Sequence, residues 1–404
     1  MGEWKEYKIS DIADVIGGGT PKTSIDKYWN GDIPWLAPRD LTGYNKVYIS
    51  HGDRFITEEG LKKSSTKLMP KGSVLLTSRA PIGYVAIAQN EICTNQGFKS
   101  LVPKKDLCNS EFLYYWIKSN VDYLQQLGTG TTFAEISGSV VKNIDISLPP
   151  LKEQKAIAEV LSSLDDKIDL LHRQNKTLEE LAQTLFRQGF IEEAKDEWET
   201  CKLSDIAIMQ NGFSFSSKHY IPYEKGHLEV LKMGHIERGG GLKLNPKKDF
   251  VPREEKLEKW VLNKNDIVMA MTDMKDNVVI LGVPAIIDKS DKYVLNQRVA
   301  RIYLKSNNKL LNNYLLYVQL KNPDFIAFLQ SKANSGVQVN LSTQAIKDSE
   351  IIIPPMNIQE TIGKDITDLY LKKENNDIQI KTLENMRDTL LPKLMSGEVR
   401  VKYE

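Results

Sequence analysis

Cysteine, histidine and long apolar runs are all scarce in this chain of 404 residues. Its 3 cysteines, Cys93, Cys108 and Cys201, are too few and too scattered to predict a disulfide framework or a zinc site. The 5 histidines show no spacing typical of metal ligands, so we predict no metal site. No apolar run approaches the roughly 20 residues of a membrane helix, and the first residues lack the basic-then-apolar pattern of a signal peptide. We therefore expect no membrane association and a reducing, cytoplasmic location.

Motifs of the common enzyme classes are also missing. The Asn- or Asp-Pro-Pro-aromatic tetrapeptide of amino-methyl transfer does not occur, because the two Pro-Pro pairs follow Leu148 and Ile353. The dinucleotide-binding glycines, the Walker lysine and the nucleophile-elbow serine are absent. We therefore predict no catalytic residues and no cofactor in this chain. A fused nuclease or methyltransferase stays an alternative, which activity of the isolated chain with a metal ion or S-adenosylmethionine would reveal.

Charge is nearly balanced overall, at +1, but it is unevenly distributed. Residues 1–150 carry 17 basic and 16 acidic side chains, and residues 201–350 carry 22 and 16. Residues 151–200 carry 7 basic and 12 acidic side chains, and residues 351–404 carry 8 and 9. Affinity for nucleic acid depends on neutralising phosphates. We therefore expect 1–150 and 201–350 to face DNA, and the acidic segment between them to face a protein.

What the chain does contain is an internal duplication. The segment Trp4–Ala13 returns as Trp198–Ala207, and Leu148-Pro149-Pro150 with Gln154 returns as Ile353-Pro354-Pro355 with Gln359. The offset grows only from 194 residues at the first match to 205 at the last, which indicates two copies with adjusted loops. Buried strands predicted at 72–77 and 266–270, and helices at 112–118 and 314–320, indicate an α/β or α+β fold with mixed sheets. The predicted order is domain 1–150, helix 151–197, domain 198–355 and helix 356–404.

Each copy is followed by a heptad stripe of apolar residues. The first stripe covers about 34 residues and hence about 50 Å of helix, with Asn175 and Ala182 filling two of its positions. Lys373, Asn376 and Arg387 interrupt the second stripe. The seam residues are Ile157, Leu161, Leu164, Ile168, Leu171, Leu178 and Leu185 with Ile362, Ile366, Leu369, Ile380, Leu383 and Leu390. The pattern predicts an antiparallel coiled coil whose first helix ends at Gly189; the alternative is two separate helices, each packed on its own domain.

The ordered motifs resemble the specificity (S) subunit of type I restriction–modification systems over essentially the whole chain. The resemblance depends on four motifs. These are the Trp-x-x-x-x-[Ile/Leu]-Ser-Asp-Ile opening of each copy, the segment Thr77–Gly83, the turn Thr94–Gly97 with its echo Leu295–Arg298, and Gly130–Ser137 followed by Leu148-Pro149-Pro150. Each motif alone is weak, but the duplicated and ordered set is specific.

This resemblance implies two target recognition domains, each reading one half of a bipartite site in double-stranded DNA. The paired helices would set the spacing and dock two methyltransferase (M) subunits. S-adenosylmethionine would be bound by the M subunits and not by this chain, and restriction (R) subunits, when present, would translocate and cut. The alternative is a helix-mediated protein scaffold that does not read DNA.

Candidate DNA contacts in the first domain lie in its polar loops. They are Thr20, Lys22, Thr23, Arg39, Asp40, Arg79, Asn95, Gln96, Thr131 and Thr132. Arginine matches the acceptor pair of guanine and an amide matches adenine. The loop around Lys22 is no P-loop, because Pro21 stands before the lysine. Each candidate has a structural alternative: a surface turn, a salt bridge near Arg39, a carboxylate that pairs with Arg79, or amides that satisfy the backbone.

The second domain supplies the equivalent loops with different residues. Its candidates are Ser216, Lys218, Lys232, His235, Lys275, Asn277, Asn296, Gln297, Arg298 and Gln338. Where the first copy has Ser78–Gly83, the second has Met271–Asn277 and lacks the arginine. Different loops on a shared frame are what two different half-sites require.

Overall fold

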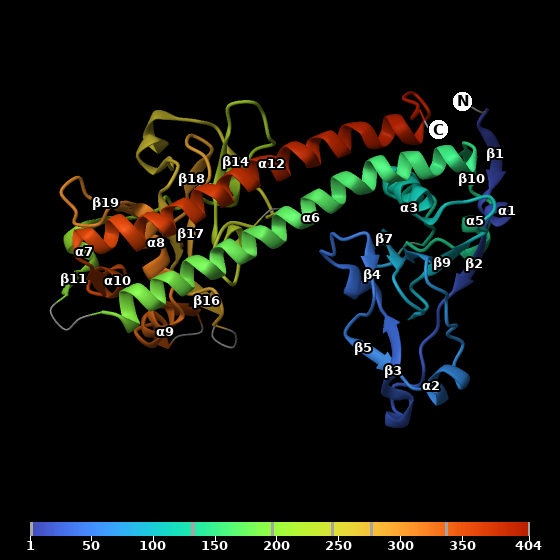
Figure 1. The fold of residues 1–404 in the computed structure, drawn as a ribbon, viewed down its shortest axis with the longest axis horizontal. Helices are drawn as coiled ribbons and strands as arrows, with labels where there is room; N and C mark the ends of the chain where they lie inside the picture. The colour runs from blue at the N-terminus through green and yellow to red at the C-terminus, as the bar shows by residue number, and fades with distance from the viewer. Residues whose placement is uncertain are drawn as a thin grey trace. The chain divides into compact units, whose positions relative to one another are not determined.

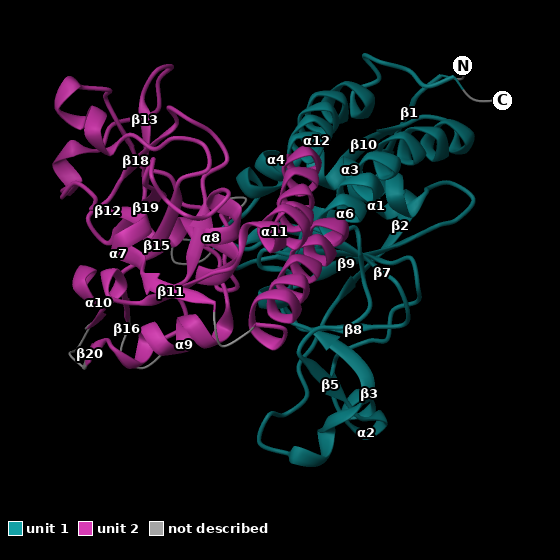
Figure 2. Ribbon diagram, turned by 60° about the vertical axis from the view of Figure 1, so that its left-hand side comes forward, with its two compact units in different colours: residues 1–172, 378–404 teal, residues 173–377 magenta. Residues whose placement is uncertain are grey.

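The computed structural model describes residues 3–130, 134–194, 198–243, 246–274, 278–335 and 338–402, apart from the side chains of Met274, Ser335 and Gln338. The chain forms two compact units (Figure 2), unit 1 from residues 1–172 with 378–404 and unit 2 from residues 173–377. Each unit holds one copy of the duplicated segment and one part of each long helix, so the long helices are built into the units.

Unit 1 is built on mixed sheets. Its five-stranded sheet has the order β2 (Ala13–Gly17), β9 (Lys99–Pro103), β6 (Val74–Ser78), β7 (Ile82–Ala88) and β4 (Tyr48–Ile49). A three-stranded sheet joins β5 (Arg54–Ile56), β3 (Trp29–Leu36) and β8 (Cys93–Thr94), and β1 (Lys5–Lys8) pairs with β10 (Asp145–Leu148). The helices are α1 (Ile9–Ile12), α2 (Glu58–Lys62), α3 (Ser110–Ser119), α4 (Val121–Gln126) and α5 (Gly138–Lys142). The pairs β3–β8 and β4–β7 are parallel among antiparallel neighbours, which confirms the predicted mixed sheet.

The core of unit 1 gathers around α3. Asn109 caps this helix by accepting a hydrogen bond from the Phe112 amide. All six residues from Phe112 to Ile117 are buried, because β7 and neighbouring elements cover the helix on several sides. Each large apolar side chain buried in this way contributes about 1.5–3 kcal/mol. The apolar run at 112–118 is therefore a core helix.

Unit 2 repeats this arrangement with changed loops. Its four-stranded sheet has the order β12 (Ala207–Asn211), β19 (Val299–Leu304), β15 (Ile267–Ala270) and β17 (Pro284–Ile286). Three-stranded sheets join β14 (Phe250–Val251), β13 (Leu228–Leu231) and β18 (Tyr293–Leu295), and β16 (Thr272–Met274), β21 (Gln338–Asn340) and β20 (Asn334–Ser335); β11 (Glu199–Lys202) pairs with β22 (Glu350–Ile353). The short helices are α7 (Leu203–Ile206), α8 (Asn313–Leu320), α9 (Pro323–Ser331), α10 (Thr343–Lys347) and α11 (Met356–Ile358).

The duplication is visible at the level of single hydrogen bonds. The buried Gln154 side chain accepts from the Asn109 amide at 2.9 Å and donates to the carbonyls of Leu107 and Pro149, each at 2.9 Å. In unit 2, Gln359 accepts from the Leu311 amide at 2.8 Å and donates to the carbonyls of Lys309 and Pro354 at 3.0 and 2.8 Å. The same joint therefore fastens the start of each long helical segment to the chain before the core helix.

The two long helices, α6 (Leu151–Arg187) and α12 (Lys364–Met395), run antiparallel (Figure 1). Within unit 1, Asp165 on α6 contacts Arg387 on α12. Within unit 2, Glu179 contacts Lys373. Residues later in α6 thus contact residues earlier in α12, as in an antiparallel pair. The predicted antiparallel pairing is confirmed, and the alternative of two separate helices is not.

The predicted seam residues line this pairing. Ile157, Leu161, Ile168, Leu171, Ile366 and Ile380 are buried, and Leu164, Leu178, Leu185, Ile362, Leu369, Leu383 and Leu390 are half-buried. Phe186 and Phe190, which the heptad pattern does not predict, are also buried and widen the stripe in unit 2.

The prediction that the first long helix ends at Gly189 is wrong. Beyond Arg187 the helix continues as a π-helical turn, Gln188–Glu192. A Cβ atom on Gly189 would lie 2.4 Å from the Cδ1 atom of Ile362. The glycine therefore allows two helical segments to approach closely and does not stop the helix.

A polar layer interrupts the seam in unit 2. The side-chain amide of the buried Asn376 donates to the Oδ1 atom of Asn175 at 2.9 Å. The side-chain amide of Asn175 donates to Asp377 at 2.6 Å. Such a layer in a coiled coil lowers stability but fixes register.

Replacing both asparagines by leucine is expected to stabilise the chain, because two desolvated amides leave an apolar seam together and Asp377 keeps its ion pair with Lys373. Asn175→Leu alone is expected to cost about 1–3 kcal/mol, because Asn376 and Asp377 each lose a hydrogen-bond partner. The midpoint of urea unfolding measures both effects. A double variant less stable than either single variant would contradict this account of the layer.

Candidate nucleic-acid interface

In unit 1, the predicted loops meet at the turn of residues 94–97. The Gly19 amide donates to the Thr94 carbonyl at 2.9 Å, and the Asn95 amide donates to the Leu36 carbonyl at 2.8 Å. The hydroxyl of Thr20 donates to the Gln96 side chain. A Cβ atom on Gly97 would lie 2.8 Å from Pro38, which places the turn before Arg39 against the same segment. Candidates separated by up to 76 residues are thus brought to one place.

Some of these side chains face solvent and others support the loops. Lys22, Thr23, Arg39 and Gln96 are exposed. Arg39 lies 3.7 Å from Asp53 with both side chains largely exposed, and such a pair contributes little and leaves the guanidinium available.

Asp40 and Asn95 have local structural roles. Asp40 accepts from the Ala37 amide at 2.7 Å and so begins the helical turn Pro38–Leu41. The side-chain oxygen of Asn95 accepts from the Gly97 amide at 2.8 Å. In both cases a polar side chain satisfies the backbone of the turn, which for Asn95 is the alternative that the sequence left open.

Arg79 lies in a cluster that we call the charged triad: Arg79, Lys99 and Glu135. The guanidinium donates to the Oε2 atom of Glu135 at 3.3 Å, and the ammonium of Lys99 donates to Oε1 at 3.2 Å. The predicted carboxylate partner of Arg79 is therefore present. Lys99 and Glu135 could not be predicted from the sequence, because the bridge that brings residue 135 beside residue 79 leaves no local pattern. The candidates Thr131 and Thr132 lie outside the described residues.

Unit 2 uses the same frame around its turn of residues 295–298. The Phe213 amide donates to the Leu295 carbonyl at 2.9 Å, and the Asn296 amide donates to the Leu231 carbonyl at 3.1 Å. The side chains of Ser216, Lys218, Gln297 and Arg298 are exposed around it. Asn296 itself is 8% exposed and its oxygen accepts from the Arg298 amide at 3.3 Å, so it supports the turn as Asn95 does.

The prediction that His235 faces a ligand is not supported by its position. This side chain is only 2% exposed. Its Nε2 atom lies 3.1 Å from a carboxylate oxygen of the buried Glu229, and its Nδ1 atom accepts from the Lys232 amide at 3.2 Å. His235 therefore braces the loop from inside.

Lys232 is half-buried at the surface of that loop. Its ammonium lies 2.6 Å from Asp249 and 4.0 Å from the centre of the Tyr220 ring. Burial alone would lower the pKa of Lys232, but the contacts with Asp249 and Tyr220 outweigh it and raise the pKa. Lys232 therefore carries a positive charge whose nearest carboxylate already balances it.

In unit 2, the segment after Met271 and the segment before Leu341 occupy the places that hold Arg79 and Glu135 in unit 1. Met271 donates its amide to the Arg298 carbonyl and accepts from the Leu341 amide, just as Ser78 donates to Gly97 and accepts from Ile136. In the register of β16 with β21, Thr272 lies opposite Asn340. Lys275 and Asn277 lie outside the described residues, and nothing is described of the Gln338 side chain.

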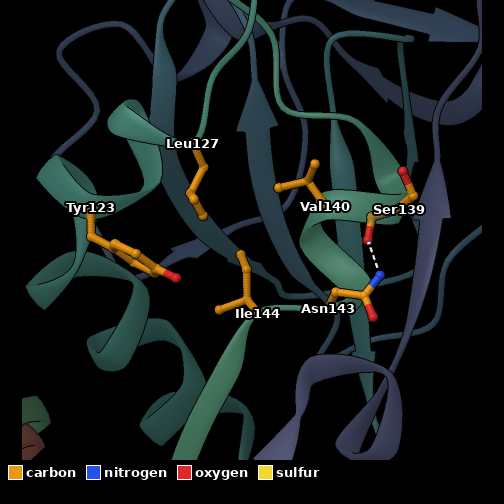
Figure 3. A pocket seen from close by; sticks show the side chains of 6 residues that line it. All are labelled: Tyr123, Leu127, Ser139, Val140, Asn143 and Ile144. Carbon is orange, nitrogen blue, oxygen red and sulfur yellow. Dashed lines mark hydrogen bonds between the residues drawn. The ribbon is translucent and has the colours of Figure 1, made fainter.

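A separate hollow of about 290 Å³ lies in unit 1 (Figure 3). It is lined by Tyr123, Leu127, Ser139, Val140, Asn143 and Ile144. The side-chain amide of Asn143 donates to the Ser139 carbonyl at 2.8 Å, so the main polar group of the hollow is already bonded. The lining holds no charged side chain and none of the predicted contact residues.

The described residues contain no group of three histidine, cysteine or acidic side chains that could hold a metal ion. Within the same part of the chain, no helix is long and apolar enough to cross a bilayer.

Taken from the residues upward, the site consists of two equivalent loop clusters on a duplicated α/β frame joined to a pair of antiparallel helices. This arrangement defines a protein with two similar but chemically different loop surfaces. Comparison with known proteins identifies the family: the chain belongs to the type I restriction modification DNA specificity domain family, whose model matches residues 1–180 and 195–385. The resemblance inferred from the sequence is confirmed, and the scaffold alternative is not favoured.

Relatives and a solved structure agree along the whole chain. The chain is 35% identical to the specificity subunit of the type I restriction enzyme MjaIX of Methanocaldococcus jannaschii, over 99% of this chain and 94% of the relative. It is 24% identical to the HindI specificity subunit of Haemophilus influenzae, over 99% and 100% of the two chains. The crystal structure of a type I S subunit from M. genitalium has the same fold, with a TM-score of 0.58 at 18% identity, covering 97% of this chain and 96% of that chain.

Proposed function

We propose that each unit of this specificity subunit reads one half of a bipartite sequence in double-stranded DNA. The observation that carries the proposal is the pair of loop clusters, which share their backbone hydrogen bonds and differ in their side chains. Unit 1 presents Arg79, Lys99 and Glu135 where unit 2 presents neutral residues. Polar and charged groups in loops at one site are typical of direct base and phosphate contacts.

The two long helices are proposed as the docking surface for two M subunits. Five apolar side chains on these helices lie outside the seam and are 38–63% exposed: Leu170, Leu181, Leu371, Ile378 and Met386. Exposed apolar side chains on both helices, outside their seam, are available for contact with a protein partner. S-adenosylmethionine would then be held by the M subunits, and this chain would supply neither a cofactor nor a catalytic group. R subunits, when present, would join the same complex. Because the target is DNA, we propose a cytoplasmic location for this complex.

The test of this proposal is DNA binding by the full chain with and without its M subunit. The half-site sequences are first read from the adenines methylated in cells that express the system. We expect a stable complex with the M subunit and at least tenfold tighter binding of the bipartite duplex in that complex. Failure to recover a complex in a pull-down, or equal affinity with and without the M subunit, would contradict the proposal.

The docking surface has its own variant. Ile378→Glu with Met386→Glu is expected to reduce the yield of the complex with the M subunit at least tenfold, because it puts two carboxylates into a contact that must be desolvated. The matched control is Tyr223→Glu, which places a carboxylate at an apolar residue that is 65% exposed but lies off the helices. An equal loss of complex in the control would show that the helices are not the surface.

A further inference from the structure

We propose that Glu135 is a positioning residue that aims Arg79 at a guanine in the half-site of unit 1. This inference rests on the proposed function and deepens it, because it names the base and the group that orients its reader. It starts from the charged triad, in which one carboxylate serves two cations.

Each oxygen of the Glu135 carboxylate accepts a hydrogen bond from a different cation. Its Oε1 atom takes the Lys99 ammonium and its Oε2 atom takes a single N–H of Arg79. Among the described residues, Arg79 makes its side-chain hydrogen bond to Glu135, so most of its five donors are left for a ligand. The Arg79 side chain is 36% exposed, whereas Lys99 is 17% exposed. Arg79 is therefore the more exposed of the two cations, and Glu135 is exposed to nearly the same degree, at 35%.

Glu135 is held by its backbone. It exchanges two hydrogen bonds with Thr129, at 3.1 and 3.0 Å, and the next amide, of Ile136, donates to the Ser78 carbonyl at 3.0 Å. Ser78 is fully buried and directly precedes Arg79. Both members of the ion pair therefore stand on one bridge that backbone hydrogen bonds hold in place. A carboxylate held in this way fixes the direction of the guanidinium, whereas a mobile surface pair would not.

Unit 2 shows that the frame does not need this triad. Its equivalents of Arg79 and Glu135 are Thr272 and Asn340, which face each other in the register of β16 and β21. Lys99 pairs with Gly17 in unit 1, and in the same position of unit 2 Ala300 pairs with Asn211. All three charges are lost together while the surrounding backbone hydrogen bonds are kept. The triad therefore serves what differs between the units, which is the sequence that each one binds.

Guanine is the base that fits. A guanidinium oriented along one edge matches the two acceptors O6 and N7 of guanine in the major groove. The triad carries two positive charges and one negative charge, so it also favours the negatively charged duplex. Unit 2 has neutral residues at the three equivalent positions, so its half-site is expected to be unaffected by changes in the triad.

The experiment uses the full chain in complex with its M subunit. The probes are duplexes with the methylated bipartite sequence and its single base-pair substitutions. Arg79→Lys keeps the charge but loses the planar fork. It is expected to reduce discrimination at one G·C pair of one half-site about tenfold or more, because a bidentate contact contributes about 1–3 kcal/mol and 1.4 kcal/mol is tenfold. Its affinity for unrelated DNA is expected to stay the same.

Glu135→Gln gives the signature of a positioning role. Discrimination at the same G·C pair is expected to fall, while affinity for unrelated DNA rises, because one negative charge is removed beside two cations. A purely structural role would lower both affinities. The control is Glu59→Gln, which removes an exposed carboxylate that pairs with Lys27 in the same unit and is expected to leave discrimination unchanged. Melting temperature and recovery of the complex check the fold of each variant.

The outcomes separate this inference from the proposed function. If the wild-type complex discriminates both half-sites but Arg79→Lys keeps full discrimination at every position, the role of the triad is wrong and the proposed function stands. The role of Glu135 is also refuted if Glu135→Gln lowers specific and unrelated binding alike. If the wild-type complex itself shows no sequence preference, the proposed function fails first.

Discussion

Replacing Arg387 by alanine is expected to lower the free energy of unfolding by about 3 kcal/mol or more, because it leaves a buried carboxylate without its cation. The Arg387 and Asp165 side chains are 17% and 10% exposed and lie 2.7 Å apart. The second oxygen of Asp165 accepts from the Tyr115 hydroxyl at 2.7 Å. Burial and the nearby charge of Asp165 raise the pKa of Tyr115, so its hydroxyl stays protonated. One arginine thus supports contacts among α3, α6 and α12.

Urea unfolding of the full chain measures this effect. The matched control is Arg187→Ala on α6, whose side chain is 75% exposed and whose ion pair with Glu192 is expected to contribute less than about 1 kcal/mol. A triple variant, Asp165→Leu with Tyr115→Phe and Arg387→Met, removes all three polar partners together and is expected to recover most of the loss. A loss below about 1 kcal/mol in Arg387→Ala, the range of an exposed pair, would show that the cluster is not desolvated.

Deleting one facing heptad from each long helix is expected to shorten the unread spacer of the DNA site and to leave both half-sites unchanged. The segments are residues 171–177 of α6 and residues 375–381 of α12. Their removal closes the seam in register, so that Leu178 follows Ile168 at heptad spacing and Leu383 follows Lys373. The ion pairs Asp165–Arg387 and Glu179–Lys373 are kept. Seven residues of helix measure about 10 Å, and DNA rises about 3.4 Å per base pair, so the spacer is expected to lose one to three base pairs.

Sequencing of methylated adenines in cells that express the variant gives the spacer and both half-sites in one experiment. The control deletes the α6 segment alone, which breaks the register of the seam and is expected to abolish methylation. A variant with changed half-sites and an unchanged spacer would show that the helices do not set the spacing.

The elements that sequence reasoning found are those whose pattern is local or repeated. The heptad stripe predicted the antiparallel helices because burial on one face requires that periodicity. Gly189 was misjudged because a glycine that permits close helix packing and one that ends a helix look alike in sequence. Only the distance from its position to Ile362 separates the two explanations.

The site was predicted less completely than the fold. Loops with polar residues at equivalent places in the two copies could be found, and the turns at 94–97 and 295–298 do bring them together. The sequence could not predict which side chains of these loops face solvent. His235 is buried against Glu229, and Glu135 reaches Arg79 only through a bridge between residues 56 positions apart. Such contacts depend on tertiary packing, which propensities do not encode.

The joints made by Gln154 and Gln359 have a consequence for how such a chain can change. Among the described residues, each glutamine bonds to main-chain atoms only, and these atoms are present whatever side chains surround them. A foreign recognition module that keeps the two prolines and the same loop backbone would therefore be held by the glutamine of the long helical segment through the same hydrogen bonds. New target preferences can then be acquired by exchanging whole modules, without any change in the joint that the glutamine makes.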